Sequence, residues 1–364
     1  MRLERIFHSI PAWMNPDGPE SGIVISSRAR LARNVSGFPY AHLAGDDKLR
    51  EIVDTVLDTA NGAGFDRSGF FRNEDLDDAG KAIFVERHLI GYPNAASALA
   101  GSPDPSLAGR NFPRGVLVME GEYTSILINE EDHLRIQSLC SGFDPMKAWE
   151  EVDSIDDRLS QSIQFSFSRK YGYLTACPTN IGTGLRISIL VHLPALVLTN
   201  DAQRMIRSAG QIGLVIRGYF GEGSDVVGNI FQISNHVSLG KPERDIVEEL
   251  IRAATTIIDY EKRAADTLMK DAKNQVEDKI FRSAGILKSA RVLSTSEFMN
   301  LGSAVRLGLY LNVLSRPDLR SLNELLVITQ PGHLQALQGH AADSMDRDVK
   351  RADLVRERFI DVRL

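Results

Sequence analysis

The pattern of hydrophobic and polar positions changes several times along the chain, and each pattern predicts an element. Residues 23–33 begin with three apolar residues and are predicted to be extended. Arg28 and Arg30 then lie on the same face, because side chains alternate along a strand with a period of two. Leucine, isoleucine and valine between residues 46 and 60 recur at helical spacing, which predicts a helix.

A hairpin is predicted in the middle of the chain. Apolar runs at residues 116–119 and 125–128 flank Glu120-Gly121-Glu122, a combination typical of two strands joined by a turn. The next strand follows three acidic residues. Its alternation places Leu134 and Ile136 in the core and Arg135 on the opposite face.

Asp144-Pro145 predicts the start of a helix, because aspartate caps a first turn and proline suits the first helical position. The apolar face of this helix consists of Met146, Trp149, Val152, Ile155, Leu159 and Ile163. Asn200 is expected to cap another helix, which runs to about Ala209.

The remaining stretches before residue 240 are shorter. Strands are predicted at residues 187–192, 212–216 and 229–235, and residues 83–90 indicate a strand or the end of a helix. Residues 92–114 are rich in Gly, Pro, Ser, Asn and Ala without periodicity, which indicates a surface excursion.

The pattern becomes helical after about Pro242. The apolar residues that begin a long helix are Ile246, Leu250, Ala254, Ile257 and Ile258. No strand is predicted from there to the C-terminus. Short strands joined by hairpins and mixed with helices predict the α+β class, not a doubly wound sheet. The sequence therefore predicts an α+β domain over residues 1–260 and an all-helical domain over residues 261–364.

Composition narrows the class of protein. With 364 residues and 43% hydrophobic content, the chain is long enough for two domains. No apolar run approaches the length of about 20 residues that a membrane span needs, and the N-terminus lacks the core of a signal peptide. A cytoplasmic protein is therefore expected.

The net charge of −6 argues against general binding to nucleic acid or to anionic membranes. Cys140 and Cys177 provide neither a disulfide framework nor a metal site.

Two glycine-rich segments carry candidate chemistry. In residues 177–186, with the sequence CPTNIGTGLR, Gly182 and Gly184 allow the backbone to approach a ligand and expose its amide groups. Arg186 ends the segment with a planar fork suited to phosphate oxygens. Residues 217–224 form a second glycine-rich loop, of a kind that closes over ligands in many enzymes. An ordinary connection between strands is the alternative for residues 177–186.

Arginines and carboxylates gather at strand ends and in these loops. The arginines are Arg28, Arg30, Arg135, Arg186 and Arg217, the carboxylates are Glu131 and Glu222, and Cys177 joins them. Phosphoryl transfer needs cations around the phosphates of a nucleotide and a nucleophile held in line. If the nucleophile is a guanidinium nitrogen, carboxylates must bind it and help to remove a proton. The sequence contains neither a P-loop nor the motif set of the protein kinases.

Four motifs in order resemble the signatures of the phosphagen (guanidino) kinase catalytic domain. They are SSRAR at residues 26–30, NEEDHLR at 129–135, CPTNIGTGLR at 177–186 and RGYFGE at 217–222. The resemblance covers most of residues 23–260. It implies an antiparallel sheet flanked by helices, ATP as the phosphoryl donor, and Mg²⁺ carried on the phosphates of ATP.

The resemblance also implies a role for each motif. The five arginines hold the phosphates, and His88 packs near the adenine. Glu131 and Glu222 bind the guanidinium and serve as base, with Cys177 at their side. The other residues that the resemblance assigns to ATP binding are Ser26, Ser27, Ala29, Ile187, Ser188, Ile189, Leu190, Gly218, Tyr219, Phe220 and Gly221, and Glu222 belongs to the same loop.

Within that family the chain resembles the bacterial kinases that phosphorylate arginine in proteins. Only 25 residues precede Ser26, whereas kinases of small guanidines carry a helical domain there that covers the substrate. The all-helical tail is similar to that of the bacterial branch. This resemblance implies protein substrates with exposed arginines, a homodimer, an activator protein and a Clp-type protease chaperone as partners. It also implies a role in marking proteins for degradation or in the stress response.

The tail contains a second candidate site. Residues Arg347, Asp348, Val349, Lys350, Arg351 and Ala352 match the RDxxRA motif of the bacterial branch, which implies an allosteric pocket for phosphoarginine. Arg347 and Arg351 share a helix face at a separation of four residues, where both can contact a phosphate. A solvated charged helix is the alternative.

Two other functions fit the same motifs less closely. One is a kinase of free arginine or another small guanidino compound. The other is an adaptor that binds phosphoarginine proteins without catalysis. Intact catalytic residues in all four motifs argue against the adaptor, and the short N-terminal segment argues against a small acceptor.

Overall fold

The computed structural model describes residues 6–7, 9–66, 69–91, 112–219, 226–339 and 343–363. Within these residues one sheet of eight strands forms the centre, in the order β2-β3-β4-β5-β1-β8-β10-β9, and every neighbouring pair is antiparallel. The strands are β1 (Val24–Arg33), β2 (Phe70–Arg72), β3 (Gly115–Val118), β4 (Thr124–Ile128), β5 (Leu134–Ser141), β8 (Leu185–His192), β9 (Leu214–Arg217) and β10 (Ile230–Asn235). A short separate ribbon pairs β6 (Phe167–Ser168) with β7 (Gly172–Tyr173).

Helices cover one face of the sheet and form the largest core with it. These helices are α2 (Asp46–Gly62), α5 (Pro145–Ser160) and α8 (Glu243–Asp271). Alternation along the strands supplies the sheet side of this core, because Leu134 and Ile136 are buried against the helices while Arg135 faces away. On the opposite face, α3 (Asp78–Glu86) packs on β3 and β4 in a smaller cluster. The predicted α+β architecture with an antiparallel sheet and flanking helices is confirmed.

The structure changes some predicted details between residues 83 and 216. The segment 83–90 is the end of α3, and His88 follows it with a positive φ of 58°. Asn200 does not cap a helix: it adopts φ 60° and precedes Asp201, the N-cap of α7 (Ala202–Gln211). Ile212 ends α7, so that the strand predicted from residue 212 begins two residues later, at Leu214.

Two helix predictions are confirmed with small changes. Asp144 caps α5 through Lys147 N–H, and Pro145 occupies the first helical position, as predicted. The helix ends at Ser160, and Ile163 is buried in the core beyond that end. Between β8 and β9 the chain forms the short helix α6 (Pro194–Leu198) before α7.

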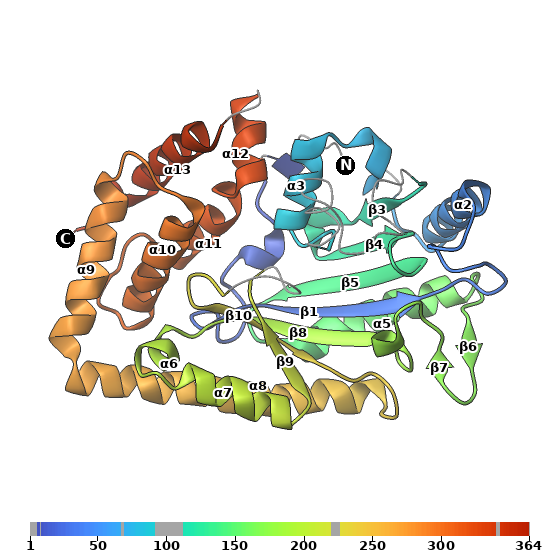
Figure 1. The fold of residues 1–364 in the computed structure, drawn as a ribbon, viewed down its shortest axis with the longest axis horizontal. Coiled ribbons are helices and arrows are strands. Elements are labelled where there is room, and N and C mark those ends of the chain that lie inside the picture. The colour runs from blue at the N-terminus through green and yellow to red at the C-terminus, as the bar shows by residue number, and fades with distance from the viewer. Residues whose placement is uncertain are drawn as a thin grey trace.

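The part of the chain that the structure describes beyond β10 contains helices and no strand. After α8 come α9 (Lys273–Ser289), α10 (Thr295–Tyr310), α11 (Leu319–Ile328), α12 (Pro331–Gln338) and α13 (Ser344–Phe359). Figure 1 shows these helices grouped beside the sheet, with α12 next to α3 at the top of the view. The predicted domain boundary at residue 260 falls inside α8, which is continuous, and the boundary stays a prediction. Among the helices described, none combines the length and the apolar character that a bilayer crossing needs.

Candidate active site

Four arginines from three neighbouring strands meet on the sheet face that carries α3. Arg28 and Arg30 come from β1, Arg135 from β5 and Arg186 from β8. In the sheet register Arg30 lies opposite Arg186, and Ala32, two residues further along β1, lies opposite Arg135. All four arginine side chains are half-buried. The structure thus brings together residues that the sequence separates by more than 150 positions.

The electrostatics of this cluster favour a bound anion. Burial and the like charges of Arg135 and Arg186 lower the pKa of Arg28 to about 9. Burial and the neighbouring arginines also lower the pKa of Arg30, while Glu130 acts in the opposite direction. Guanidiniums this close repel one another, and phosphate oxygens between them relieve that repulsion and accept their hydrogen bonds.

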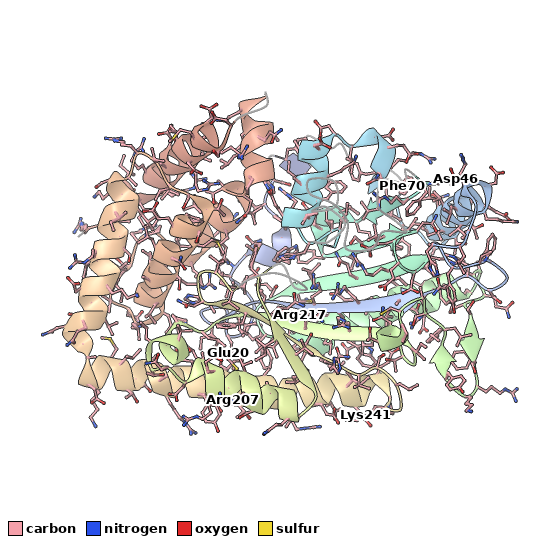
Figure 2. All side chains as sticks on the ribbon, in the orientation of Figure 1. Glu20, Asp46, Phe70, Arg207, Arg217 and Lys241 are labelled. Carbon is pink, nitrogen blue, oxygen red and sulfur yellow. The ribbon has the colours of Figure 1, made fainter. Side chains whose placement is uncertain are left out.

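The fifth predicted arginine lies near the same cluster. Arg217 ends β9, and in the register it lies opposite Gln232 of β10. The Gln232 side chain in turn accepts a hydrogen bond from Arg28 Nη2, with a distance of 3.2 Å between nitrogen and Oε1. In Figure 2, Arg217 lies over the middle of the molecule, whereas Arg207 and Lys241 lie along its lower rim. Because paired residues of neighbouring strands share a face, Arg217 lies on the same sheet face as Gln232, the partner of Arg28.

The three carboxylates of the acidic turn between β4 and β5 have different partners. Glu130 forms an ion pair with Arg135. Asp132 is buried and accepts hydrogen bonds from Asn34 Nδ2 and from the backbone N–H of Ala176, both at 2.7 Å. Asp132 therefore ties the turn to the segment that carries Cys177. Sequence analysis did not identify Asn34 or Asp132, because polar residues beside a predicted site carry no local signal for this pairing.

Glu131 is the carboxylate of this turn that faces Cys177. Partial burial raises the pKa of Glu131, the charges of Asp132 and Glu130 raise it further, and a hydrogen bond with Cys177 opposes them. The Cys177 thiol is half-buried, and its Sγ lies 3.0 Å from Thr179 Oγ1. A carboxylate and a thiol thus lie side by side, within reach of the charge of Arg135.

The two glycines of the 177–186 segment serve the protein's own backbone. A Cβ at Gly182, whose φ is 111°, would lie 2.4 Å from Ser238 O, and one at Gly184 would lie 2.6 Å from Ala32 O. The Gly182 N–H is bonded to Tyr173 O. The expectation that the Gly182 amide faces a ligand is therefore wrong. Both glycines allow the loop to pack tightly, which places Cys177 and Arg186.

A small, open depression lies beside the arginines on the same face. The residues that line it are Ser26, Arg28, His88, Leu139, Ser188, Leu190, Tyr219 and Gln232. Six of these were among the residues that the resemblance assigns to ATP binding, and Leu139 and Gln232 were not. Leu139 lies four residues after Arg135 in β5, so alternation puts both side chains on the same face. Gln232 is on this face too, because its side chain bonds to Arg28.

Four other residues that the resemblance assigns to ATP binding face away from this cavity. Ala29, Ile187 and Ile189 are buried in the core under the helices. The Ser27 hydroxyl donates to Gly142 O at 2.8 Å and accepts from Asp144 N–H. Because side chains alternate along a strand, these four support the sheet from behind and their side chains do not line the cavity.

His88 closes one end of the cavity. Its ring packs edge-on against Tyr219, with 5.2 Å between centroids, and against Trp13, with 5.9 Å. Burial, together with the charges of Arg28 and Arg30, lowers the pKa of His88 to about 3, so the ring is neutral at physiological pH. A neutral aromatic ring beside a phosphate-binding cluster suits a purine base.

Part of the second glycine-rich loop lies outside the described residues. Gly218 and Tyr219 are buried next to Arg217. Phe220, Gly221 and Glu222 belong to the segment 220–225, which is not described. The roles that the resemblance assigns to these three residues stay predictions.

The RDVKRA sequence in the tail lies on α13 and is partly built into the core. Arg351 is 1% exposed, and its guanidinium donates to Thr329 O, Leu293 O and Asp348 Oδ1 at 2.9, 2.7 and 2.5 Å. Ala352 is buried, Arg347, Asp348 and Lys350 are half-buried, and Val349 is exposed. Two of the three nitrogens of Arg351 therefore bind the protein itself, and Arg347 is the arginine of the motif that faces outward.

Comparison with known families gives two matches that follow each other along the chain. The family described as ATP:guanido phosphotransferase, C-terminal catalytic domain, matches residues 48–264. The family described as Protein-arginine kinase McsB C-terminal domain matches residues 273–363.

Curated relatives match nearly the whole chain. The protein-arginine kinase of Halothermothrix orenii is 42% identical over 95% of this chain and 96% of its own length. That of Symbiobacterium thermophilum is 43% identical over 95% and 96%, and that of Bacillus subtilis is 40% identical over 96% and 94%.

Solved structures share the fold at lower identity. A lombricine kinase is 23% identical with a TM-score of 0.56, over 72% of this chain and 70% of that one. The duplicated taurocyamine kinase of Schistosoma mansoni is 23% identical with a TM-score of 0.56, over 70% and 36%. At this identity the likeness establishes the fold alone.

Proposed function

The chain belongs to the ATP:guanido phosphotransferase family, among the protein-arginine kinases, and on this premise we propose that it phosphorylates arginine side chains of proteins with ATP. One observation carries the chemistry. Four arginines from three strands converge on one sheet face, and this cluster ends at the pair Glu131 and Cys177. Such an arrangement suits the transfer of a phosphoryl group from a polyphosphate to a cationic acceptor.

We propose a binding mode in which the nucleotide follows the sheet face. Its adenine lies in the cavity beside His88, and its phosphates contact Arg28, Arg30, Arg135 and Arg186, with Arg217 closing from β9. We propose that Mg²⁺ enters on the phosphates of ATP. Bound there, Mg²⁺ would neutralise phosphate charge.

We propose that the acceptor guanidinium lies against the Glu131 carboxylate, beside Cys177. A carboxylate bonded to the guanidinium N–H orients one nitrogen toward the γ-phosphorus and accepts the proton that this nitrogen loses. The new P–N bond forms as the bond from the γ-phosphorus to the bridging oxygen breaks, and ADP leaves. Glu222 is the second carboxylate proposed for this step. Burial and the neighbouring carboxylates raise the pKa of Glu131, which makes it a better proton acceptor than an ordinary carboxylate.

The acceptor distinguishes this proposal from the kinase of free arginine. Incubation with ATP and casein should give acid-labile phosphoarginine, detected by mass spectrometry under non-acidic conditions. Free arginine is added in a parallel reaction. Equal or faster turnover of free arginine would contradict a protein acceptor, and an absence of both products would favour the phosphoarginine-binding adaptor.

The finer features of partners and location rest on the resemblance to the bacterial kinases. We propose a cytoplasmic homodimer that works with an activator protein and supplies substrates to a Clp-type protease chaperone, in protein degradation or stress response. Light scattering after size exclusion tests the dimer. Copurification from a cell lysate, with and without ATP, tests the other two partners.

We also propose that the RDVKRA sequence binds phosphoarginine as an effector. Because two nitrogens of Arg351 already bind backbone carbonyls and Asp348, Arg347 is the better candidate to contact the phosphate. Asp348 lies next to Arg347 in the sequence and forms an ion pair with Arg351, so it stands between the two arginines of the motif.

A further inference from the structure

A helix of the C-terminal region packs directly on α3, the helix that ends two residues before His88. Gly332, in the first turn of α12, lies against α3 so closely that a Cβ there would come within 2.7 Å of Ala82 Cβ and 3.0 Å of Ile83 N. Figure 1 shows the two helices side by side. Residues about 250 positions apart thus share a contact with no room for one more methyl group.

Glu86, the last residue of α3, binds the N-terminus of α12. Its carboxylate accepts hydrogen bonds from the backbone N–H groups of Gly332 and His333, at 2.6 and 3.1 Å. These are among the N–H groups that a helix cannot satisfy internally, and a negative charge there is favourable. The carboxylate is also 2.6 Å from His333 Nδ1. Glu86 is therefore the acceptor for three donors of α12.

His333 continues this contact to Arg87. The imidazole is 1% exposed, and its Nε2 lies 3.1 Å from Arg87 Nε, which is a donor. Nε2 must therefore accept, and Nδ1–H must donate to Glu86, which specifies a neutral imidazole with the proton on Nδ1. Burial lowers the pKa of His333, in agreement with this form. A single tautomer thus connects Glu86 and Arg87 through one ring.

Arg87 fixes the backbone immediately before His88. Its guanidinium is fully buried and also binds the Glu122 carboxylate and Ser9 O. The next residue, His88, has φ 58°, a conformation that side chains other than glycine rarely adopt. Gln137 Nε2 holds the His88 carbonyl at 2.9 Å. The position of the His88 ring in the cavity therefore depends on the bonds that restrain Arg87.

We propose that Glu86, Arg87 and His333 are positioning residues through which α12 of the C-terminal region holds the His88 turn in its nucleotide-binding conformation. The inference rests on the proposed function, in which His88 lies beside the adenine. It means that the helical region contributes to nucleotide affinity through a buried contact, although no residue of α12 lines the cavity.

His333→Leu in the full-length chain is the direct test. Leucine removes both ring hydrogen bonds and leaves the donor of Arg87 without its acceptor. We expect the Kd and the KM for ATP to rise by about tenfold, the size expected for one buried hydrogen bond that holds a binding turn, while kcat at saturating ATP changes by less than about twofold. His333→Gln, whose amide oxygen can accept from Arg87, should recover part of the ATP affinity.

A matched control cuts another buried contact between the sheet and the helical region. Ser303 of α10 is 2.8 Å from His192 Nε2 and from Asn229 Nδ2, far in the chain from His88. Ser303→Ala should lower the melting temperature without changing the Kd for ATP. An equal rise of Kd in Ser303→Ala, or a Kd in His333→Leu unchanged from wild type, would overturn the proposal and leave the contact with a structural role only.

Fluorescence provides a readout that needs no nucleotide. The chain has two tryptophans, and Trp13 packs on the His88 ring, so that a Trp149→Phe background reports Trp13 alone. His333→Leu should shift the Trp13 emission, and Ser303→Ala should not. Wild-type protein without measurable ATP binding would contradict the proposed function. An unshifted Trp13 emission in His333→Leu would contradict the positioning role by itself.

Discussion

Arginine side chains are used in opposite ways in two regions of this molecule. On the sheet face, the charged neighbours that lower the pKa of Arg28 are two other arginines. In α13, Arg351 is buried more deeply, but a carboxylate and two backbone carbonyls surround its guanidinium. An arginine with such partners joins parts of the protein, whereas arginines that repel one another need an anion from outside.

The same contrast occurs within a single strand. Arg33 lies on β1 with Arg28, but it faces the helix-covered side. There it forms a two-pronged ion pair with Asp156 of α5, with 3.0 Å from Nε to Oδ1 and 2.8 Å from Nη2 to Oδ2, and its guanidinium lies 3.5 Å from the Tyr173 ring centroid. Residue type and strand therefore do not decide the role of an arginine. Its charged neighbours do.

The largest effect on turnover is expected at Glu131, where the arginine cluster meets the acceptor guanidinium. Glu131→Gln keeps the size of the side chain but removes the charge that binds a guanidinium and takes its proton. Turnover should fall by about 10²–10⁴-fold, with little change in the Kd for ATP, because acid–base help of this kind is worth that much. Initial rates and calorimetry measure the two quantities. Glu51→Gln, at an exposed pair with Lys48, is the control. If ATP binding were lost while turnover stayed normal, Glu131 would serve the nucleotide and not the guanidinium.

Arg33→Gln should cause the largest loss of stability. The substitution leaves the Asp156 carboxylate buried without its partner, and breaking such a pair costs about 3–5 kcal/mol of unfolding free energy. Urea denaturation monitored by circular dichroism gives the value. A change below the resolution of that measurement would mean that Arg33 belongs with the sheet arginines and not with Arg351.

Arg28→Gln, on the same strand, should weaken ATP binding without a loss of stability. Removing one of several repelling charges should leave the unfolding free energy unchanged or raise it. The KM for ATP should rise by about 10- to 100-fold, because a charged hydrogen bond contributes about 1.5–3 kcal/mol. A variant that unfolds more easily and still binds ATP normally would remove the distinction between the two regions.

The smallest structural effect is expected at the outward arginine of α13. Arg347→Ala should lower the melting temperature less than a substitution of the buried Arg351 and should abolish binding of free phosphoarginine. Calorimetry with phosphoarginine is the measurement. Arg351→Lys is the paired variant and should lower the melting temperature, because lysine cannot reach Thr329 O and Leu293 O together. If Arg347→Ala bound phosphoarginine with unchanged affinity, the RDVKRA sequence would not be the phosphoarginine site, and α13 would be only a solvated charged helix.

The sequence by itself determined the local features of this protein. Strand alternation placed Leu134 and Ile136 in the core and Arg135 outside it, and Asp144-Pro145 marked the start of α5, because these signals depend only on nearby residues. The motifs also pointed to a guanidino kinase, and the family matches confirm this. Local signals failed by a residue or two at Asn200 and Ile212, where turn geometry rather than composition set the helix ends.

Only the tertiary structure decided how distant residues are paired. Nothing near Gly182 in the sequence indicates that Ser238 will fill the space beside it, and nothing near Glu86 indicates that α12 will supply its donors. Likewise, alternation places Arg33 and Arg28 on opposite faces of β1, but only the fold brings Asp156 to Arg33. A side chain's charge environment is the sum of contacts from segments more than 100 residues away, and the packing of the core brings those segments together.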